Sequence, residues 1–344
     1  MRRGGYDSYR GRSRFRTFLK VLIVLLLVLL VLAVGALLWL EPYIDYSAGG
    51  IRIDLPFFRQ EEPEPPSSAP VVVVTPEVQP TPTPEPEEPF RAVLLPNTAL
   101  YDGTAGQQVA AAGANAAVFD MKADDGQLGY ISQLELAVQA GTSAADPALN
   151  AAIQLLNSGD VYTVARVSCF RDNAMPRADR GLALHSSAGN WLDDGEYRWL
   201  SPANAEARQY VVGVCRELAE LGFDEILLDN WSFPVRGETG RLLADENYPA
   251  ETLATALGTF LNEVEGALAD YPEVRLSLTT TSAVANGTAE ETGGQTAALL
   301  EQADRVLVYQ GDGEALPALG DTQVLPVLEQ AGTAEGSWAV LTIE

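Results

Sequence analysis

The sequence predicts an α/β protein whose main domain is a closed (β/α)8 TIM barrel, and three observations support this. Strand-like and helix-like segments alternate after residue 90, which is typical of parallel sheets. Residues 90–344 give this part about 250 residues, the usual size of such a barrel. In residues 222–234 a short apolar run ends in a carboxylate, Asp229. Barrels of this kind carry their functional groups at the carboxyl ends of the strands.

The first 40 residues predict a membrane anchor. Residues 1–20 carry seven Arg and Lys against one Asp, and residues 21–40 form an uninterrupted apolar run long enough to span a bilayer as one helix. Because the basic residues precede the run, we expect a single-pass protein of the cell membrane, with a cytoplasmic N-terminus and an extracytoplasmic barrel. A cleaved signal peptide is the alternative, although its apolar core is usually shorter and precedes a small-residue cleavage site.

Residues 41–89 are expected to connect the anchor to the barrel. Residues 41–58 mix aromatic and apolar residues without a clear pattern, whereas proline and glutamate dominate residues 60–89. Such a composition cannot bury a core and favours an extended polyproline II conformation. We therefore expect a disordered stalk that lifts the next domain off the membrane.

Residues 90–344 supply the alternating elements of the predicted barrel. Helices are expected at residues 146–156, 204–221, 250–270 and 294–302. Since the sequence ends at the eighth strand-like run, we expect the closing helix to be missing or very short. An open doubly wound sheet is the alternative, although no glycine-rich phosphate-binding loop follows the first run. The eight strand-like runs are residues 92–96, 115–121, 162–170, 223–229, 275–280, 305–309, 323–329 and 338–343.

Charge and rare residues exclude several classes of function. The net charge is −25, and because residues 1–20 contribute +6, the remainder carries −31; this argues against nucleic acid as a partner. Cys169 and Cys215 do not make a disulfide framework, and we expect two buried thiols. His185 is the only histidine, which excludes a multi-histidine zinc site and leaves little room for a Ser-His-Asp triad. We expect no cofactor and no metal.

Strand alternation predicts which charged side chains meet inside the barrel. If Asp229 points into the barrel mouth, Glu225 points into the barrel more deeply and needs a cation there; Arg166, on the preceding strand, is the expected partner. Asp120 and Lys122 are expected to share one side of another strand, and Lys122 is the only lysine outside residues 1–20. A structural ion pair is the favoured interpretation for Glu225 and Arg166, and a functional role for Asp229.

Four blocks of sequence resemble a bacterial domain family classed with the glycoside hydrolases and related to the TIM-barrel α-amylase-like enzymes. Their order and spacing match that family over about 120 residues, and the strand–helix rhythm extends the match through the globular part. The blocks are AVFDMKADDGQLGY at 117–130, ARVSCFRDNAMP at 165–176, WLDDGEYRWLSP at 191–202 and ELAELGFDEILLDNWSFP at 217–234.

The resemblance implies a barrel that acts on carbohydrate, with Asp229 at the nucleophile position on the fourth strand. It also implies a sugar site lined or supported by Asp120, Lys122, Arg166 and the Asp124–Asp125 pair. Trp191 and Trp199, on a long loop, and Trp231, beside Asp229, are candidates for stacking on sugar rings. Packing of the loop tryptophans against the barrel is the open alternative.

The C-terminal part departs from the family pattern. Thr279 stands where the family usually has an aspartate at a strand tip, and only Tyr309 survives from a later motif at residues 307–313. A retaining glycosidase needs a second carboxyl group about 5 Å from the first. Glu329, at the tip of the seventh strand, is the expected substitute, with Asp312 and Glu291 as weaker candidates.

A second departure concerns a cation of the site. Ser232 stands where the family has an arginine, and Arg236 lies close enough in sequence to compensate.

We therefore expect a membrane-anchored, extracytoplasmic glycoside hydrolase-like protein acting on cell-wall or environmental polysaccharide. The alternative is a catalytically degenerate carbohydrate-binding barrel at the cell surface. A carboxylate about 5–9 Å from that of Asp229 would keep hydrolysis open. An Asp229 that faces only Arg and Lys side chains would favour binding without cleavage.

Overall fold

The computed structural model describes residues 44–47, 50–53, 88–310, 315–331 and 335–342. The chain divides into two units, Met1–Thr83 and Pro84–Glu344. The predicted basic tail, the apolar run at 21–40 and nearly all of the proline-rich stalk lie outside the described residues. Within the described part, none of the helices combines the length and the apolar character needed to cross a bilayer. In the first unit, β1 (Ile44–Ser47) and β2 (Gly50–Ile53) pair in antiparallel fashion.

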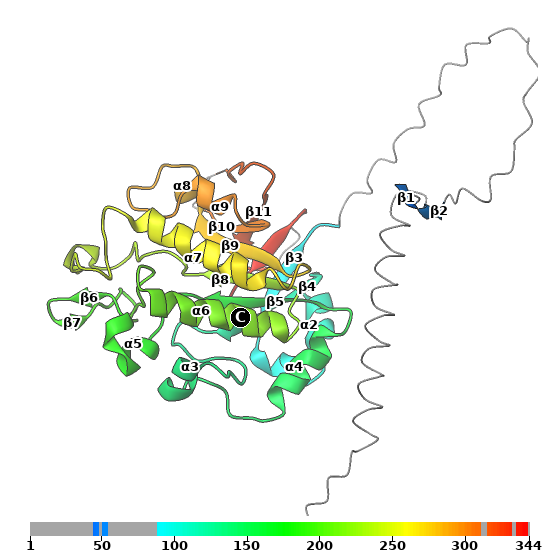
Figure 1. Ribbon diagram of the computed structural model, residues 1–344, viewed down its shortest axis with the longest axis horizontal. Coiled ribbons are helices and arrows are strands. Elements are labelled where there is room, and N and C mark those ends of the chain that lie inside the picture. The colour runs from blue at the N-terminus through cyan, green and yellow to red at the C-terminus, as the bar shows by residue number, and fades with distance from the viewer. Residues whose placement is uncertain (1–43, 48–49, 54–87, 311–314, 332–334, 343–344) are drawn as a thin grey trace, which may run out of the picture. The chain divides into compact units, whose positions relative to one another are not determined.

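Eight parallel strands close into a barrel in the second unit (Figure 1), as the sequence predicts. They follow one another around the barrel in chain order, and the last pairs with the first, Trp338 opposite Arg91. Each predicted run overlaps one strand, so the closed barrel is confirmed over the open sheet. The strands are β3 (Arg91–Leu95), β4 (Ala116–Lys122), β5 (Tyr162–Ser168), β8 (Glu225–Asp229), β9 (Arg275–Thr281), β10 (Arg305–Tyr309), β11 (Gln323–Leu328) and β12 (Trp338–Val340).

Helices pack against the outer faces of the barrel strands. The longest two, α6 (Ala205–Glu220) and α7 (Leu253–Leu268), lie side by side against the strands (Figure 1). The Asn204 side chain begins α6 by accepting hydrogen bonds from two backbone N–H groups of its first turn, a favoured N-cap. The shorter helices are α2 (Ala105–Ala111), α3 (Glu135–Ala140), α4 (Leu149–Asn157), α5 (Met175–Ala178), α8 (Ser282–Ala285) and α9 (Ala297–Leu300).

Three short helical turns and a small hairpin complete the loops. The turns are Asn97–Leu100, Arg180–Leu182 and Thr239–Arg241. β6 (His185–Ser186) and β7 (Gly189–Asn190) form the hairpin, in the long loop between β5 and α6. The helix predicted at 294–302 is reduced to the four residues of α9.

The strands carry apolar residues on both faces, which is typical of a parallel sheet buried on both sides. Side chains such as Val118, Val164, Leu227 and Leu307 pack together inside the barrel. The opposite faces of the strands pack against the helices in a second, larger core. The barrel interior is therefore filled, and a site can form only at its ends.

A buried ion pair lies inside the barrel at the amino ends of the strands, but its partners differ from those predicted. Glu225 accepts hydrogen bonds from Arg305, at the start of β10, and from the Tyr162 hydroxyl at 2.9 Å. The guanidinium of Arg305 lies 3.5 Å from the centre of the Phe90 ring. Arg166 is not the partner, because the β5–β8 register sets Arg166 beside Leu227, one layer nearer the carboxyl ends.

We predict that Glu225→Ala lowers the free energy of unfolding by about 3–5 kcal/mol, because it leaves the Arg305 charge buried without its partner. Urea denaturation at neutral pH measures this loss. The matched control is Glu220→Ala, since Glu220 pairs with Arg216 at the exposed surface and such pairs contribute about 1 kcal/mol or less. Equal losses in the two variants would contradict the assignment.

Candidate functional site

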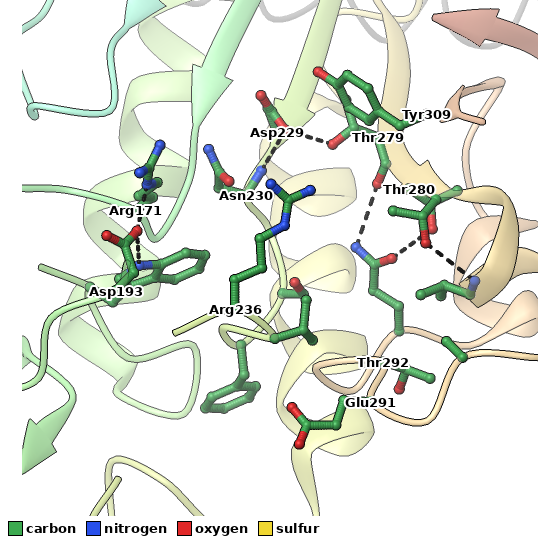
Figure 2. A pocket seen from close by; sticks show the side chains of 18 of the residues that line it. Arg171, Asp193, Asp229, Asn230, Arg236, Thr279, Thr280, Glu291, Thr292 and Tyr309 are labelled. Atoms are coloured by element: carbon green, nitrogen blue, oxygen red, sulfur yellow. Dashed lines mark hydrogen bonds and ion pairs between the residues drawn. The ribbon is translucent and has the colours of Figure 1, made fainter. Parts of the chain in front are cut away.

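A cleft of about 420 Å³ opens at the carboxyl ends of the strands (Figure 2), within the usual range of small-molecule sites of about 300–1,000 Å³. The ends of β8, β9 and β10 contribute Asp229, Thr279 and Tyr309 to its lining, and Arg166 enters from β5. The loops that follow β8 and β9 form the rest of the wall. The strand ends thus bring together residues that are up to 143 positions apart in the sequence.

Four donors hold the carboxylate of Asp229. Its Oδ2 accepts from Arg166 Nε at 2.9 Å and lies 2.6 Å from Arg166 Nη2. Its Oδ1 accepts from the Thr279 hydroxyl at 2.7 Å and from the backbone N–H of Asn230 at 2.9 Å. A carboxylate offers about four lone-pair sites, so these contacts fix the group firmly at the inner end of the cleft.

The backbone turns sharply at Asn230, directly after the strand. Its φ is 49°, in the left-handed region that asparagine tolerates better than most residues. The Nδ2 amide of Asn230 donates to Asp124 Oδ1 at 3.2 Å and to the Ser168 hydroxyl at 3.0 Å. Asn230 therefore supports Asp229 with its backbone and Asp124 with its side chain.

Arg166 joins three carboxylates at the barrel mouth. Besides Asp229, its guanidinium donates from Nη1 to Asp120 Oδ1 at 2.7 Å and from Nη2 to Asp124 Oδ1 at 3.0 Å. Because Asp124 and Asp229 share the Nη2 nitrogen, their oxygens are separated by at most about 5.6 Å, comparable with the ~5–5.5 Å of retaining glycosidases.

The network continues through a second arginine. Arg171 lies 2.5 Å from Asp124 Oδ2 through Nη1 and 2.7 Å from Asp193 Oδ2 through Nε. Asp193 also accepts from the indole N–H of Trp199 at 3.1 Å. The long loop between β5 and α6 is thereby tied to the charged mouth of the barrel.

Burial and the arginines drive the pKa values of two neighbouring acids in opposite directions. Burial raises the pKa of Asp120 and outweighs the opposing effect of Arg166. Burial also acts on Asp124, but Arg166, the hydroxyl of Ser168 and Arg171 together outweigh it and hold the pKa of Asp124 below its usual value. Pairs of acids with divergent pKa values are the usual basis for separate acid and base roles in an active site.

Lys122 does not reach the mouth, and its predicted sugar contact is wrong. The register between β4 and β5 shifts between Asp120 and Lys122, a bulge that turns Lys122 to the outer face of the barrel. Its ammonium is fully buried, 2.9 Å from Asp172 Oδ2, and donates to the Ser168 carbonyl at 2.7 Å. Lys122 is therefore part of the core between barrel and helices.

The predicted stacking of tryptophans on sugar is also wrong for two of the three. Trp231 is 0% and Trp191 2% exposed. Their indole N–H groups donate to the carbonyls of Thr279, at 2.8 Å, and Glu238, at 3.0 Å. Trp199 lines the cleft but is only 7% exposed. The alternative, packing of the long loop against the barrel, accounts for Trp191, and Trp231, just after β8, is buried as well; for Trp199, stacking on sugar stays a prediction.

The remaining predicted residues lie as follows. Tyr309 lines the cleft and is 39% exposed, and burial together with Asp229 raises its pKa. Asp125 is exposed in a turn and accepts from the Gln127 backbone N–H, so that Asp124 reaches the cleft in its place. Glu329 is exposed after β11 and is not among the residues that line the cleft. Asp312 lies outside the described residues.

Sequence reasoning missed Arg171 and Asp193. Both belong to the four blocks, in 165–176 and 191–202, and this membership was the signal that could have identified them.

No group of three or more metal-binding side chains is arranged around one point within the described ranges. Cys169 and Cys215 are free and buried, which confirms the predicted thiols.

Residues 106–308 match the model of a family described as “Putative glycosyl hydrolase domain”. The match covers more than half of the 344 residues. The chain belongs to this family. The four blocks of the sequence fall inside the matched range, so the resemblance they indicate is confirmed, and the barrel is glycoside hydrolase-like. Among curated proteins, none matches the chain.

The chain is similar to several solved structures over parts of its length, among them the following three. A hypothetical protein from Ruminiclostridium thermocellum is 26% identical, covering 54% of this chain and 96% of its own, with a TM-score of 0.46. The glycoside hydrolase domain of PelA from Pseudomonas aeruginosa is 16% identical, covering 64% and 67%, at 0.36. The GH36 alpha-galactosidase AgaA from Geobacillus stearothermophilus is 11% identical, covering 56% and 28%, at 0.37.

We predict that Asp124→Asn lowers the free energy of unfolding at pH 7 by about 1–3 kcal/mol, since two arginines lose a charged acceptor. The pKa of Asp124 is lower in the folded protein than in the unfolded chain. Its contribution is therefore complete above the unfolded value of 3.8 and is lost as the pH falls through the folded one.

Thermal or urea unfolding of parent and Asp124→Asn protein from pH 7 to pH 2.5 tests this prediction. The gap should narrow at acidic pH. Asp125→Asn is the matched control, because Asp125 is exposed in the same turn and asparagine can still accept its hydrogen bond; it should show no such gap. A gap that is constant over the whole range would contradict the predicted linkage.

Proposed function

We propose that this barrel is a glycoside hydrolase that cleaves polysaccharide, with Asp229 as its central catalytic carboxylate. The observation that carries the proposal is the position of Asp229. It ends a barrel strand inside an open cleft, and one guanidinium joins it to two further carboxylates. Carboxyl pairs flanking the scissile bond are the usual catalytic groups of glycosidases. Membership of a glycosyl hydrolase family supports the same reaction class.

Asp120 is the proposed proton donor, in place of Glu329. Like Glu329 it is not among the residues that line the cleft, but it shares Arg166 with Asp229, occupies the interior-facing position of β4 in register with Arg166, and has a side chain that is 31% exposed. Its Oδ2 accepts no hydrogen bond from the described residues, whereas Asp124 is bound through both oxygens to arginines. The raised pKa of Asp120 favours the protonated form that an acid requires.

The reaction then follows the retaining scheme. An oxygen of Asp229 attacks the anomeric carbon while the glycosidic bond breaks, and the leaving oxygen takes the proton of Asp120. The Asp120 carboxylate next removes a proton from water, which attacks the same carbon and releases Asp229. Attack requires Asp229 to give up one of its four hydrogen bonds, and the Thr279 hydroxyl, which can rotate, is the most easily displaced donor.

Binding without cleavage is the second candidate, and Thr279 is the observation that favours it. Thr279 lies at the strand tip beside Asp229 and saturates it with a hydrogen bond where a second carboxylate would be expected. A barrel of this kind would hold a glycan through the cleft and leave the glycosidic bond intact.

We place this activity outside the cell membrane, acting on cell-wall or environmental polysaccharide. The support is the composition of the first 89 residues: a basic tail, an apolar run of 20 residues and a segment rich in proline and glutamate. This order is typical of an anchored protein with its globular part exported.

We predict that Asp229→Asn abolishes product formation while the chain still folds, with a loss of about 1–3 kcal/mol in the free energy of unfolding because Arg166 loses a charged acceptor. The full-length chain is incubated with α- and β-glucans, galactans and purified peptidoglycan, and reducing ends are followed for a day. Asp270→Asn, at an exposed position after α7, is the control and should match the parent. Retention on one polysaccharide without product from the parent would support the binding barrel instead.

We predict that Asp120→Asn lowers kcat by about 10²–10⁴-fold on natural polysaccharide, the usual contribution of a positioned acid. The loss should be much smaller with aryl glycosides, whose leaving groups need no protonation. The parent rate should fall as the pH rises through the raised pKa of Asp120, and this limb should disappear in the variant. An equal loss on both kinds of substrate would contradict the role of Asp120.

A further inference from the structure

Three arginines line the cleft, and two of them are fully engaged by acids. Arg166 contacts Asp120, Asp124 and Asp229, and Arg171 contacts Asp124 and Asp193. Their hydrogen-bonding edges are used within the protein. They can therefore shape the site but have few donors left for a ligand.

Arg236 is different. It lies on the loop after β8, is exposed and lines the cleft. Figure 2 shows its side chain extending along the cleft, with the guanidinium directed toward the strand ends that carry Asp229 and Thr279. Nevertheless it makes no hydrogen bond or ion pair with any of the described residues. A cation with all five donors free is thus presented to the cleft.

Two hydroxyl groups in the same cleft also lack partners within the described part of the chain. Tyr309 and Ser232 both line the cleft, and neither side-chain oxygen has a hydrogen-bond partner there. Arg236 is near enough to Tyr309 for its charge to act on the phenol. The lining of the cleft therefore offers one guanidinium and two hydroxyl groups that have no hydrogen-bond partner among the described residues.

The acids at the rim do not neutralise this cation. Glu291 and Asp194 line the cleft and are exposed, yet neither forms an ion pair with a described residue. Figure 2 shows Glu291 on the far side of the cleft from Asp229, with the side chain of Arg236 between them. An anionic group at the tip of Arg236 would thus lie away from Glu291, and the carboxylates of Asp124 and Asp229 in the same cleft are already paired with Arg166.

We propose that the glycan recognised by this cleft carries a carboxylate, as in a uronic acid residue, and that Arg236 binds this carboxylate with the hydroxyls of Tyr309 and Ser232. The planar fork of arginine matches a carboxylate in two parallel hydrogen bonds. A neutral sugar would leave the guanidinium charge without a partner in the occupied cleft. This inference rests on the proposed function in so far as the barrel is taken to bind glycans.

Calorimetric binding to the full-length chain tests the inference. The probes are oligosaccharides of polygalacturonate, alginate and hyaluronan, each beside its carboxyl-reduced, neutral counterpart. The parent should bind at least one acidic form about 10–100-fold more tightly than its reduced form, the range expected for a charge-assisted hydrogen-bonded pair. That preference should weaken as salt is added, because exposed charges are screened.

Two variants assign the preference to Arg236. Arg236→Gln should bind acidic and reduced forms alike, at the affinity of the parent for the reduced form. Arg241→Gln is the matched control, since Arg241 is exposed, lies outside the cleft lining and pairs with Glu238; it should retain the parent's preference. No preference in the parent, or a preference that survives in Arg236→Gln, would overturn the inference.

The outcome is separable from that of the proposed hydrolysis. Cleavage of neutral glycans that depends on Asp229 but not on Arg236 would uphold the hydrolase and overturn the acidic ligand. Binding of an acidic glycan through Arg236, without any product, would uphold the ligand class and overturn hydrolysis.

Discussion

The guanidinium of Arg166 is the constraint on which the mouth of the barrel depends. It contacts carboxylates from β4, from the loop after β4 and from β8, all within 3.0 Å. Without it, three acids would face one another at close range, and like charges so placed cannot all remain ionised at low cost. The spacing and orientation of the candidate catalytic groups are therefore set by one side chain. The second arginine, Arg171, extends the same arrangement to the long loop that walls the cleft.

The fold could be predicted because each buried parallel strand is a short apolar run bounded by loop residues, a strong signal in a single sequence. The contacts of individual charges could not. Glu225 pairs with Arg305, two strands further around the barrel. The sequence alone does not show how neighbouring strands are shifted relative to one another, so it could not predict this pair. The bulge that turns Lys122 to the outer face could not be predicted either, because the alternation of side chains was applied to a regular strand.

In the candidate site, too, the positions of residues on the strands could be predicted and several of their contacts could not. Asp229, Asp120 and Tyr309 could be placed near the strand ends because the predicted runs overlap the observed strands, whereas Arg166 was expected deeper in the barrel, beside Glu225. The tryptophans could not be distinguished as packing or binding residues, because burial depends on how the loop between β5 and α6 folds back. The surroundings of Asp229 are compatible with both hydrolysis and binding. Its neighbours on β4 and β5 offer acids and a cation, as catalysis requires, while its neighbour on β9 is a threonine instead of a second carboxylate.

The burial of Lys122 has a practical consequence. It is the only lysine outside residues 1–20, and its ammonium is enclosed between Asp172 and the Ser168 carbonyl. While the barrel is folded, reagents that acylate primary amines therefore meet no accessible lysine on it. Cross-linking, fluorophore coupling or surface immobilisation through amines would report on the first 20 residues alone, and acylation of Lys122 would serve as a direct chemical record of barrel unfolding.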